Sequence, residues 1–596
     1  MTYATEKARI GRIPVQVVEI DVDVCEHTYG SAPCTASGGS GSECYNTRGT
    51  CQDPANYSAT TKTYSFCSTD APAEVVRAGY IPALRSISTA PTKIQPEKGL
   101  STRESRTLSL LDFTHHDRGI DPYVANRSYD PETQGTFWGR WLARNKYYTG
   151  RAIRIIEAYV SPDGMDLSAD SKTHHYLLDK IDGPTRGGVS ITAKDVLKLA
   201  DNDRAQCPVK SEGALASDIT DSATSLTVTT GKGSDYATYR GAAVSGSNPG
   251  YVRINDEIIE YTGVSTDTLT GLTRSQWGTV AAAHSADDDV QMCWSCEDEN
   301  AVDIVQELLE DFAAIDSAYI PSADWTTERD KWLSSANVTA IISEPTGVQK
   351  LVGELCEQLM VNIWWSDDDQ EIKLKSIIPD NLNTSTVDYT DAHHLLRDTI
   401  KVKRDPDRRL SRVVMWYSPR DWSDKIERDN MAYGLIQAAA TEEGANLYGQ
   451  QRIKIVESRW IPSQALASQT ASRLLNRRKD DPIMIEFQLD AKDDALAVGD
   501  SVTIETHHLQ DVDGSAKATK FQILSRELVE RGSKWKYSAQ NLQFSGRYAF
   551  VMQDSANDYG SANDYGSATE AELTAGGYIA PSASGFSDGG EPYKIL

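Results

Sequence analysis

Residues 24–51 read VCEHTYGSAPCTASGGSGSECYNTRGTC and carry four cysteines in a stretch rich in glycine, serine and threonine. The four are Cys25, Cys34, Cys44 and Cys51, with the spacing C-x8-C-x9-C-x6-C. Four thiols in a turn-rich segment can form two disulfides, a zinc site or an iron–sulfur cluster. The choice among these decides the class of protein and what holds its N-terminal part together.

The cysteine spacing suits the three kinds of site to different degrees. Zinc sites usually take cysteines from tight C-x-x-C knuckles, and this segment has none. Disulfides persist in oxidising compartments, and the opening MTYATEKARIGRIPVQVVEI has no continuous apolar region, so we assign no signal peptide. A [4Fe-4S] cluster tolerates wide spacing in a glycine-rich loop. All three alternatives stay open from the residues alone, with the cluster favoured.

The other five cysteines are weaker candidates. Cys67, in TYSFC, is a fifth candidate ligand, but its aromatic neighbours favour a small buried hydrophobe. Cys356 falls on the apolar face of a predicted helix and is expected in the core. Cys293 and Cys296 form a lone C-x-x-C pair, which is weak evidence for zinc, a redox pair or a disulfide. Cys207 is uninformative.

The charge of the chain restricts its partners. The 596 residues contain 60 lysines and arginines against 86 aspartates and glutamates, a net charge of −26. This balance argues against a broad nucleic-acid-binding face, which needs clustered basic residues. No apolar run is long enough for a membrane span, so none is predicted. The length predicts about three to five domains.

Shifts in composition divide the chain into expected segments. These are a leading β segment (1–24), a cysteine-rich module (25–70), a β-rich domain (71–207), an inserted small β-barrel or sandwich (208–292), an α+β domain (293–545) and a low-complexity C-terminal tail (546–596). Asn255-Asp256 predicts a hairpin turn inside the insertion. Helical spacing of apolar residues predicts helices near 300–314 and 346–360. The fold class is therefore mainly β with α+β parts, in several domains.

Histidine pairs and acidic runs give little sign of a site. Histidines pair at 115–116, 174–175, 393–394 and 507–508, and neighbours on a strand point to opposite faces. We expect these pairs in turns or on the surface. The acidic runs at 287–289 and 367–371 lack the spacing of calcium loops and are predicted to be solvated turns. With no catalytic motif in the chain, we expect no enzymatic activity.

The sequence segments around the cysteines resemble a known cysteine module. YGSAPC, CYNTRGTCQDPANY and a following FC are similar to the cysteine module of the minor tail protein L family of long-tailed phages. The resemblance implies a [4Fe-4S] cluster on Cys25, Cys34, Cys44 and Cys51, with zinc as the alternative metal. The gap between the two cysteine pairs is shorter than in the lambda type, which makes Cys67 the alternate ligand.

Further stretches resemble tail hub proteins of flagellotropic and Mu-like siphophages and of gene transfer agents. They lie at 81–105, 113–145, 250–264 and 272–279, and the resemblance covers most of residues 20–400. It implies a baseplate hub at the virion tail tip, made in the bacterial host cytoplasm, with β-barrel hub domains that form a homotrimeric ring closing the tail tube. The implied neighbours are the distal tail protein, the tape measure protein and a tip or central fibre protein.

An acidic ring has a simple physical use in such a hub. DNA would pass through the lumen without specific binding, because negative walls repel it. Two other classes of protein remain as alternatives. One is an iron–sulfur redox protein, which needs a second cofactor site or an electron path. The other is a disulfide-linked secreted adhesin.

Overall fold

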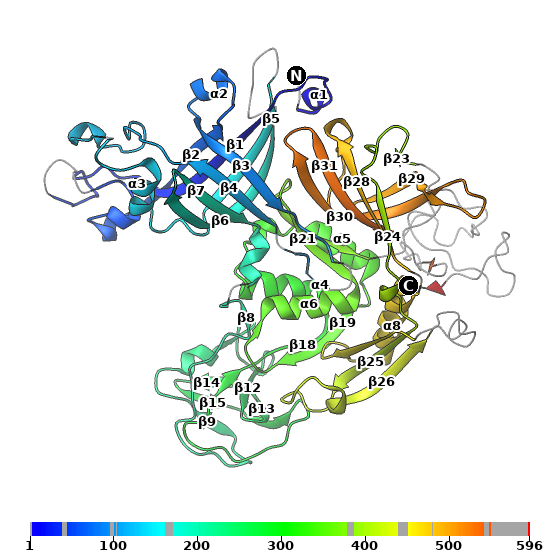
Figure 1. Cartoon of the computed structure of the whole chain (residues 1–596). Coiled ribbons are helices and arrows are strands. Elements are labelled where there is room, and N and C mark those ends of the chain that lie inside the picture. The colour runs from blue at the N-terminus through cyan, green and yellow to red at the C-terminus, as the bar shows by residue number, and fades with distance from the viewer. Residues whose placement is uncertain are drawn as a thin grey trace, which may run out of the picture.

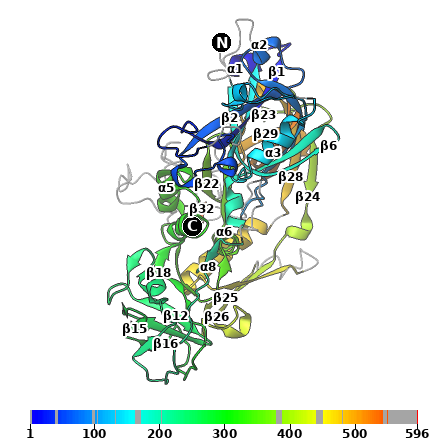
Figure 2. The same cartoon turned by 90° about the vertical axis from the view of Figure 1, so that its left-hand side faces the viewer.

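The computed structural model describes residues 3–541 except 38–43, 96–99, 103, 131, 161–170, 202, 378–386, 439–450 and 480, and also the paired strands β32 (Tyr548–Ala549) and β33 (Lys594–Ile595). The rest of the expected tail 546–596 lies outside the described residues. In Figure 1 an N-terminal barrel and a C-terminal sheet lie side by side at one end, with helices and short sheets below them. Figure 2 shows the inserted segment at the opposite end from the barrel.

A closed barrel of seven strands forms the N-terminal part. Its strand order is β1-β2-β3-β4-β7-β6-β5. The strands are β1 (Pro14–Cys25), β2 (Ala59–Ser68), β3 (Ile81–Ala90), β4 (Ser105–Leu111), β5 (Ala152–Tyr159), β6 (Ser171–Thr185) and β7 (Gly188–Lys194). The alternation of PVQVVEIDVDV places Val18, Ile20 and Val22 in the barrel core. The barrel therefore draws on the segments 1–24, 25–70 and 71–207 together.

A short helix fills one end of the barrel. In α3 (Phe137–Arg144) the aromatic side chains Phe137, Trp138 and Trp141 are all buried. Trp138 stacks on Phe66 with ring centroids 5.2 Å apart, and its indole nitrogen donates to the carbonyl of Leu111 at 3.0 Å. The dense aromatic stretch GTFWGRW is therefore a plug of the barrel core. Two shorter helices, α1 (Tyr3–Lys7) and α2 (Ala73–Arg77), lie outside it.

Residues 208–292 pack around a hydrophobic cluster of their own, which includes Leu215, Val252, Ile259 and Tyr261. The strands of this part are β9 (Ser225–Thr227), β10 (Thr238–Tyr239), β11 (Ala242–Ala243), β12 (Gly250–Ile254), β13 (Glu257–Tyr261), β14 (Gly263–Ser265), β15 (Thr268–Thr270), β16 (Thr273–Gln276) and β17 (Gln291–Met292). The predicted Asn255-Asp256 hairpin turn is confirmed, because β12 and β13 pair around it.

The two ends of this inserted segment lie together. The Ser211 amide donates to the Gln291 side chain at 3.1 Å, and the Gln291 amide group donates to the Val209 carbonyl at 3.0 Å. The Ser211 hydroxyl in turn accepts from the Met292 amide at 2.9 Å. The chain therefore leaves the body of the molecule and returns to it at one place.

The middle of the molecule is the α+β part, with one large hydrophobic core. Its elements are β8 (Gln206–Cys207), β18 (Trp294–Asn300), α4 (Ala301–Glu307), α5 (Ser322–Trp332), β19 (Asn337–Ile342), β20 (Thr346–Gly347), α6 (Val348–Leu359), β21 (Val361–Ser366), β22 (Glu371–Ser376), β25 (Arg412–Pro419), β26 (Met431–Ala438), β27 (Ile453–Ser458) and α8 (Gln464–Arg478). The Asn300 side chain caps α4 by accepting from the Val302 amide at 3.0 Å. Both predicted helices are confirmed, and the first continues as a π-helical turn to Phe312.

A six-stranded sheet lies beside the barrel, in the order β23-β29-β30-β31-β28-β24. Its strands are β23 (Tyr389–Thr390), β24 (Lys401–Arg404), β28 (Ile483–Asp490), β29 (Ser501–Gln510), β30 (Ala516–Glu530) and β31 (Lys534–Asn541). The turn between β30 and β31 touches the barrel at Gly532, whose carbonyl accepts from the Tyr159 hydroxyl at 3.0 Å. Arg12 donates to the same carbonyl at 2.8 Å and pairs with Asp490 at 2.9 Å.

The predicted fold class is confirmed: the chain is mainly β, with α+β parts in several domains. Across the described residues, no helix combines the length and the apolar character that a membrane span requires.

A buried carboxylate organises the inserted segment and provides a test of it. Glu257, which is 1% exposed, pairs with Arg274 at 2.6 Å and His284 at 2.8 Å, and also accepts from the Ala282 amide at 3.0 Å. Removing this carboxylate leaves its partners uncompensated, so we expect Glu257→Ala to destabilise the segment by about 3–5 kcal/mol. Hydrogen exchange followed by mass spectrometry should show faster exchange in residues 215–292 and unchanged protection in the barrel.

The matched control is Glu260→Ala, on the same strand but half-buried. It should leave exchange in the segment close to that of the wild type. Equal protection of residues 215–292 in the Glu257→Ala protein would show that this network does not hold the segment together.

Candidate metal centre

Strand β1 delivers the first cysteine, and backbone pairing brings the third beside it. The Cys25 amide donates to the Asn46 carbonyl at 2.7 Å, and the Asn46 side-chain amide returns a 2.5 Å hydrogen bond to the Cys25 carbonyl. Asn46 also donates its backbone amide to the Cys44 sulfur at 3.4 Å. Cys25 and Cys44 are therefore held around a single asparagine.

A second set of contacts joins the other two cysteines. The residue after Cys34, Thr35, donates both its amide and its hydroxyl to Asp53, at 2.7 and 2.9 Å. Asp53 follows Cys51 by two positions. The loop that carries Cys34 is therefore fastened to the chain just beyond Cys51.

Tyr123 joins the two parts of the loop, because its hydroxyl accepts from the Tyr29 amide at 2.8 Å and donates to the Asn46 side-chain oxygen at 3.5 Å. Burial is the main reason that the pKa of the Cys44 thiol is raised, and the hydrogen bond from Asn46 opposes that rise. The three other cysteine sulfurs raise this pKa further. All four sequence-predicted ligands are thus gathered at one end of β1, and all nine cysteines of the chain are free of disulfides.

A zinc ion and a four-iron cluster require different separations between their sulfur ligands. Four thiolates around one zinc ion lie about 3.8 Å apart, given a Zn–S bond of about 2.3 Å. In the described part of the chain, only one group of His, Cys, Asp or Glu brings three ligand atoms within 4.8 Å of one another, and it contains no cysteine. A four-iron cluster puts each thiolate on a separate iron and so needs more widely spaced sulfurs.

Cationic side chains surround the third cysteine. Arg127 donates to the Cys44 carbonyl, and the guanidinium groups of Arg127 and Arg144 lie over the Tyr45 ring, 3.8 and 4.2 Å from its centroid. The Thr47 hydroxyl donates to the Arg144 carbonyl at 2.8 Å, which ties the loop to the end of α3.

Cys67 lies too far away to replace a ligand. It is fully buried in a small apolar cluster, as predicted. It pairs with Val17 on β1, whereas Cys25 pairs with Ala59. The eight residue steps from Val17 to Cys25 span about 26 Å, so the structure separates Cys67 from the other four sulfurs.

The two cysteines of the C-x-x-C pair pack in different places. Cys293 and Cys296 are both buried, but they belong to different hydrophobic clusters. Burial raises the pKa of Cys296 to about 12 and that of Cys293 still further. The pair therefore packs as small hydrophobes, and Cys356 likewise lies in the core, as predicted.

One histidine pair hides a buried ion network that the sequence did not reveal. His174, on β6, is 2% exposed, so the expectation of a surface or turn position is wrong for this residue. Its Nδ1 lies 2.7 Å from an Asp367 oxygen and 3.1 Å from an Asp368 oxygen, while Nε2 lies 3.8 Å from Glu157. The alternation of side chains along β6 could have indicated that His174 faces inward. The partners of His174 could not be predicted, because they lie in a turn that is distant in the sequence.

This network joins three parts of the molecule. Asp367 and Asp368 lie in the turn between β21 and β22 and are largely withdrawn from solvent, so the prediction of a solvated turn is wrong for them. Asp368 pairs with Lys172 of the barrel at 2.6 Å and lies 3.8 Å from Arg526 of the C-terminal sheet. Arg106, on β4, lies 3.8 Å from Asp367.

The His174, Asp367 and Asp368 atoms form the one metal-sized group noted above, but their charges are already balanced. Burial disfavours the imidazolium, yet the charge of Asp367 and the hydrogen bonds of the neighbouring carboxylates outweigh it and raise the pKa of His174 well above its ordinary value. With a protonated His174 and nearby arginine and lysine side chains, the site acts as an ionic latch between the domains.

Comparisons with known proteins give only distant likenesses. No family model and no curated protein matches the chain. Among solved structures it is similar to the 43 kDa tail protein of prophage MuSo2 from Shewanella oneidensis, at 8% identity and a TM-score of 0.35, over 77% of this chain and 97% of that one. It is also similar to prophage tail protein gp18 from Listeria monocytogenes EGD-e, at 7% identity and a TM-score of 0.30, over 66% and 84%. At this degree of likeness, function has to be argued from the chain's own residues.

We expect the variant His174→Gln to lose unfolding free energy in a pH-dependent way, because the latch uses the charge of a protonated His174. Because the pKa of His174 is raised in the folded state, its contribution is complete below pH ~6.5 and is lost as the pH rises through the raised value. We expect the variant to lose about 3–5 kcal/mol of unfolding free energy below that pH and progressively less in alkaline buffer. Urea unfolding of both proteins over a pH series measures the difference.

The control is His175→Gln, the neighbouring histidine on the opposite face of β6. It should show no comparable pH-dependent loss. A penalty for His174→Gln that stays constant from acidic to strongly alkaline pH would mean that imidazolium charge does not hold the latch.

Proposed function

We propose that this chain is a structural phage tail protein, a baseplate hub whose N-terminal cysteine loop holds a [4Fe-4S] cluster. The observation that carries the proposal is that Cys25, Cys34, Cys44 and Cys51 gather at the end of a barrel strand. The sequence segments around them resemble the phage module. The role is mechanical rather than enzymatic. The protein would reside in the virion tail tip after synthesis in the bacterial host cytoplasm.

The cysteine loop has a physical need for such a cluster. Among the described residues, none of the buried hydrophobic clusters takes a member from the stretch between Cys25 and Ala59. When bound, the cluster would supply metal–thiolate bonds whose free energy stabilises the folded loop. Asn46 and Asp53 would hold the four thiols in position, and Arg127 would offset part of their negative charge.

The hub assignment includes an assembly. Three copies would form a ring that closes the tail tube, with the distal tail protein above it, a tip or central fibre protein below it and the tape measure protein ending inside. The closed barrel and the neighbouring six-stranded sheet are two rigid β units of the kind from which a ring wall can be built. DNA would pass through the acidic lumen without specific binding.

Metal analysis tests the cluster. Protein purified or reconstituted without oxygen should contain about four irons and four sulfides per chain and absorb broadly near ~400 nm. Cys34→Ser should lose this absorption and most of the iron, because it removes one of the four thiolates. Its C-terminal sheet should stay folded, since that sheet has its own core.

The matched control is Cys67→Ser, a buried cysteine remote from the quartet, which should retain the iron. A colourless protein containing zinc, or disulfides among these cysteines under anaerobic purification, would contradict the cluster. Iron loss in Cys67→Ser with retention in Cys34→Ser would reverse the ligand assignment.

The mass in solution tests the ring. Light scattering of the full-length protein should give three times the 65.5 kDa of one chain. A mass that stays at one chain as the protein concentration is raised into the micromolar range would count against a homotrimeric hub. It would leave the metal result unaffected.

A further inference from the structure

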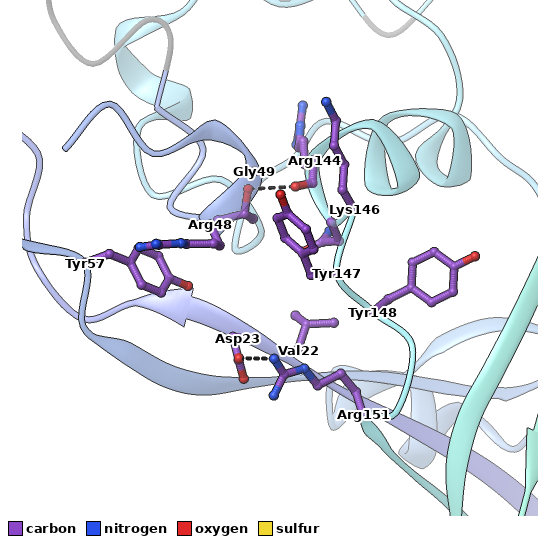
Figure 3. Close-up of a pocket in the computed structure, with 12 residues that line it drawn as sticks. Val22, Asp23, Arg48, Gly49, Tyr57, Arg144, Lys146, Tyr147, Tyr148 and Arg151 are labelled. Carbon is purple, nitrogen blue, oxygen red and sulfur yellow. Dashed lines mark hydrogen bonds and ion pairs between the residues drawn. The ribbon is translucent and has the colours of Figure 1, made fainter. Parts of the chain in front are cut away.

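A pocket of about 380 Å³ lies beside the cysteine loop, between the loop and the end of α3 (Figure 3). This volume is within the range of sites for small ligands. Its wall is made by Val22, Asp23, Thr47, Arg48, Gly49, Tyr57, Arg144, Asn145, Lys146, Tyr147, Tyr148 and Arg151. None of these residues is a cysteine, so the pocket is separate from the metal ligands.

The wall reverses the charge of the chain as a whole. It holds four basic residues and one acidic residue, although acidic residues outnumber basic ones in the sequence by 86 to 60. Two of the cations are already neutralised: Arg151 pairs with Asp23, and Arg144 pairs with Asp117 at 2.6 Å. The remaining charge on the wall comes from two side chains.

Those two are Arg48 and Lys146, which form no ion pair with any residue that the structure describes. The Arg48 guanidinium donates to the Pro54 carbonyl at 2.8 Å and lies over the Tyr57 ring, 5.0 Å from its centroid. Figure 3 shows Arg48 and Tyr57 side by side on one wall. The contact with Tyr57 orients the guanidinium and leaves donors of the fork available for an anion.

The Tyr57 hydroxyl is a second sign of a missing partner. Its oxygen is buried and has no hydrogen-bond partner among the described residues. Burial, followed by the charge of Asp23, raises the pKa of Tyr57 to about 12, so the hydroxyl remains protonated and can donate. Buried hydroxyls without partners are uncommon in proteins because they lose solvation without compensation.

Aromatic surface accounts for the rest of the wall. Tyr57, Tyr147 and Tyr148 all line the pocket, and Tyr147 is 66% exposed. In Figure 3 the Tyr147 ring stands at the centre of the view, between Arg48 and Tyr148. Exposed aromatic faces stack on planar or weakly polar rings, and the combination with cations is typical of sites for phosphorylated ring compounds.

We propose that this pocket binds a small phosphorylated ring compound, with Arg48 contacting the phosphate and the tyrosines contacting the ring. The planar fork of a guanidinium suits phosphate oxygens. Two kinds of molecule carry this chemistry: a nucleotide and a phosphorylated sugar unit. The site adds ligand binding to the structural role proposed above, and it does not require the cluster.

Calorimetric titration of the full-length protein at low salt tests the proposal. The probes are thymidine monophosphate, glucose 6-phosphate, inorganic phosphate, thymidine and glucose. The two phosphorylated ring compounds should bind at least about tenfold more tightly than thymidine or glucose, because these two unphosphorylated compounds offer no phosphate oxygens to Arg48. They should also bind more tightly than inorganic phosphate, and their relative affinities identify the nucleotide or the sugar as the preferred source.

Variants assign the contacts. Arg48→Gln should weaken binding about tenfold or more, and Tyr57→Phe should weaken it severalfold without loss of the fold. Arg118→Gln is the matched control, since Arg118 is exposed on the same domain outside the pocket and the charge change is identical. Thermal melting verifies that each variant is folded.

Three results would overturn the proposal. The first is no binding of either phosphorylated compound at millimolar concentration. The second is equal affinity in the wild type and Arg48→Gln. The third is an equal loss in Arg118→Gln, which would show that the attraction is a general effect of charge.

Discussion

The antiparallel pairing of β1 with β2 is the constraint on which the N-terminal half depends. It closes the barrel on one side, and it fixes Cys25 opposite Ala59. The stretch between them is therefore a long excursion whose two ends are pinned a strand spacing apart. Without an apolar core of its own, this excursion is held by hydrogen bonds through Asn46 and Asp53 and by the arginines around Tyr45. The same pinning carries Arg48 to the pocket wall, so the candidate metal centre and the candidate ligand site share one scaffold.

The features that could be predicted from the sequence are local, and those that could not depend on residues far apart in the chain. The Asn255-Asp256 hairpin, the two helices and the burial of Cys67 follow from short-range spacing, and all of them could be predicted. The closure of the barrel could not, because β4 pairs with β7 and the chain doubles back through β6 and β5. The cysteines were found from their spacing and neighbouring words. The pocket was missed, since Arg48 and Lys146 lie far apart in sequence.

The ionic latch illustrates the same limit and has its own energetics. His174 and Asp367 come from different domains, and no local pattern links them. Burying several charges carries a large desolvation penalty, so such a network adds less stability than well-packed apolar residues would. What it supplies is orientation, because its ion pairs connect the barrel, the β21–β22 turn and β30. The network therefore fixes the angle between these domains at the expense of some stability.

The inserted segment leaves and rejoins the body at a single point, where Ser211 and Gln291 clasp each other. A segment joined in this way is covalently continuous with the body at one place only. The segment also packs against the body, since Trp277 lies edge-on to Trp422 with ring centroids 5.2 Å apart and Arg253 pairs with Glu344 at 2.5 Å. Changes in sequence or length can therefore be accommodated on the face of the segment that points away from these contacts, while the flanking strands keep their register.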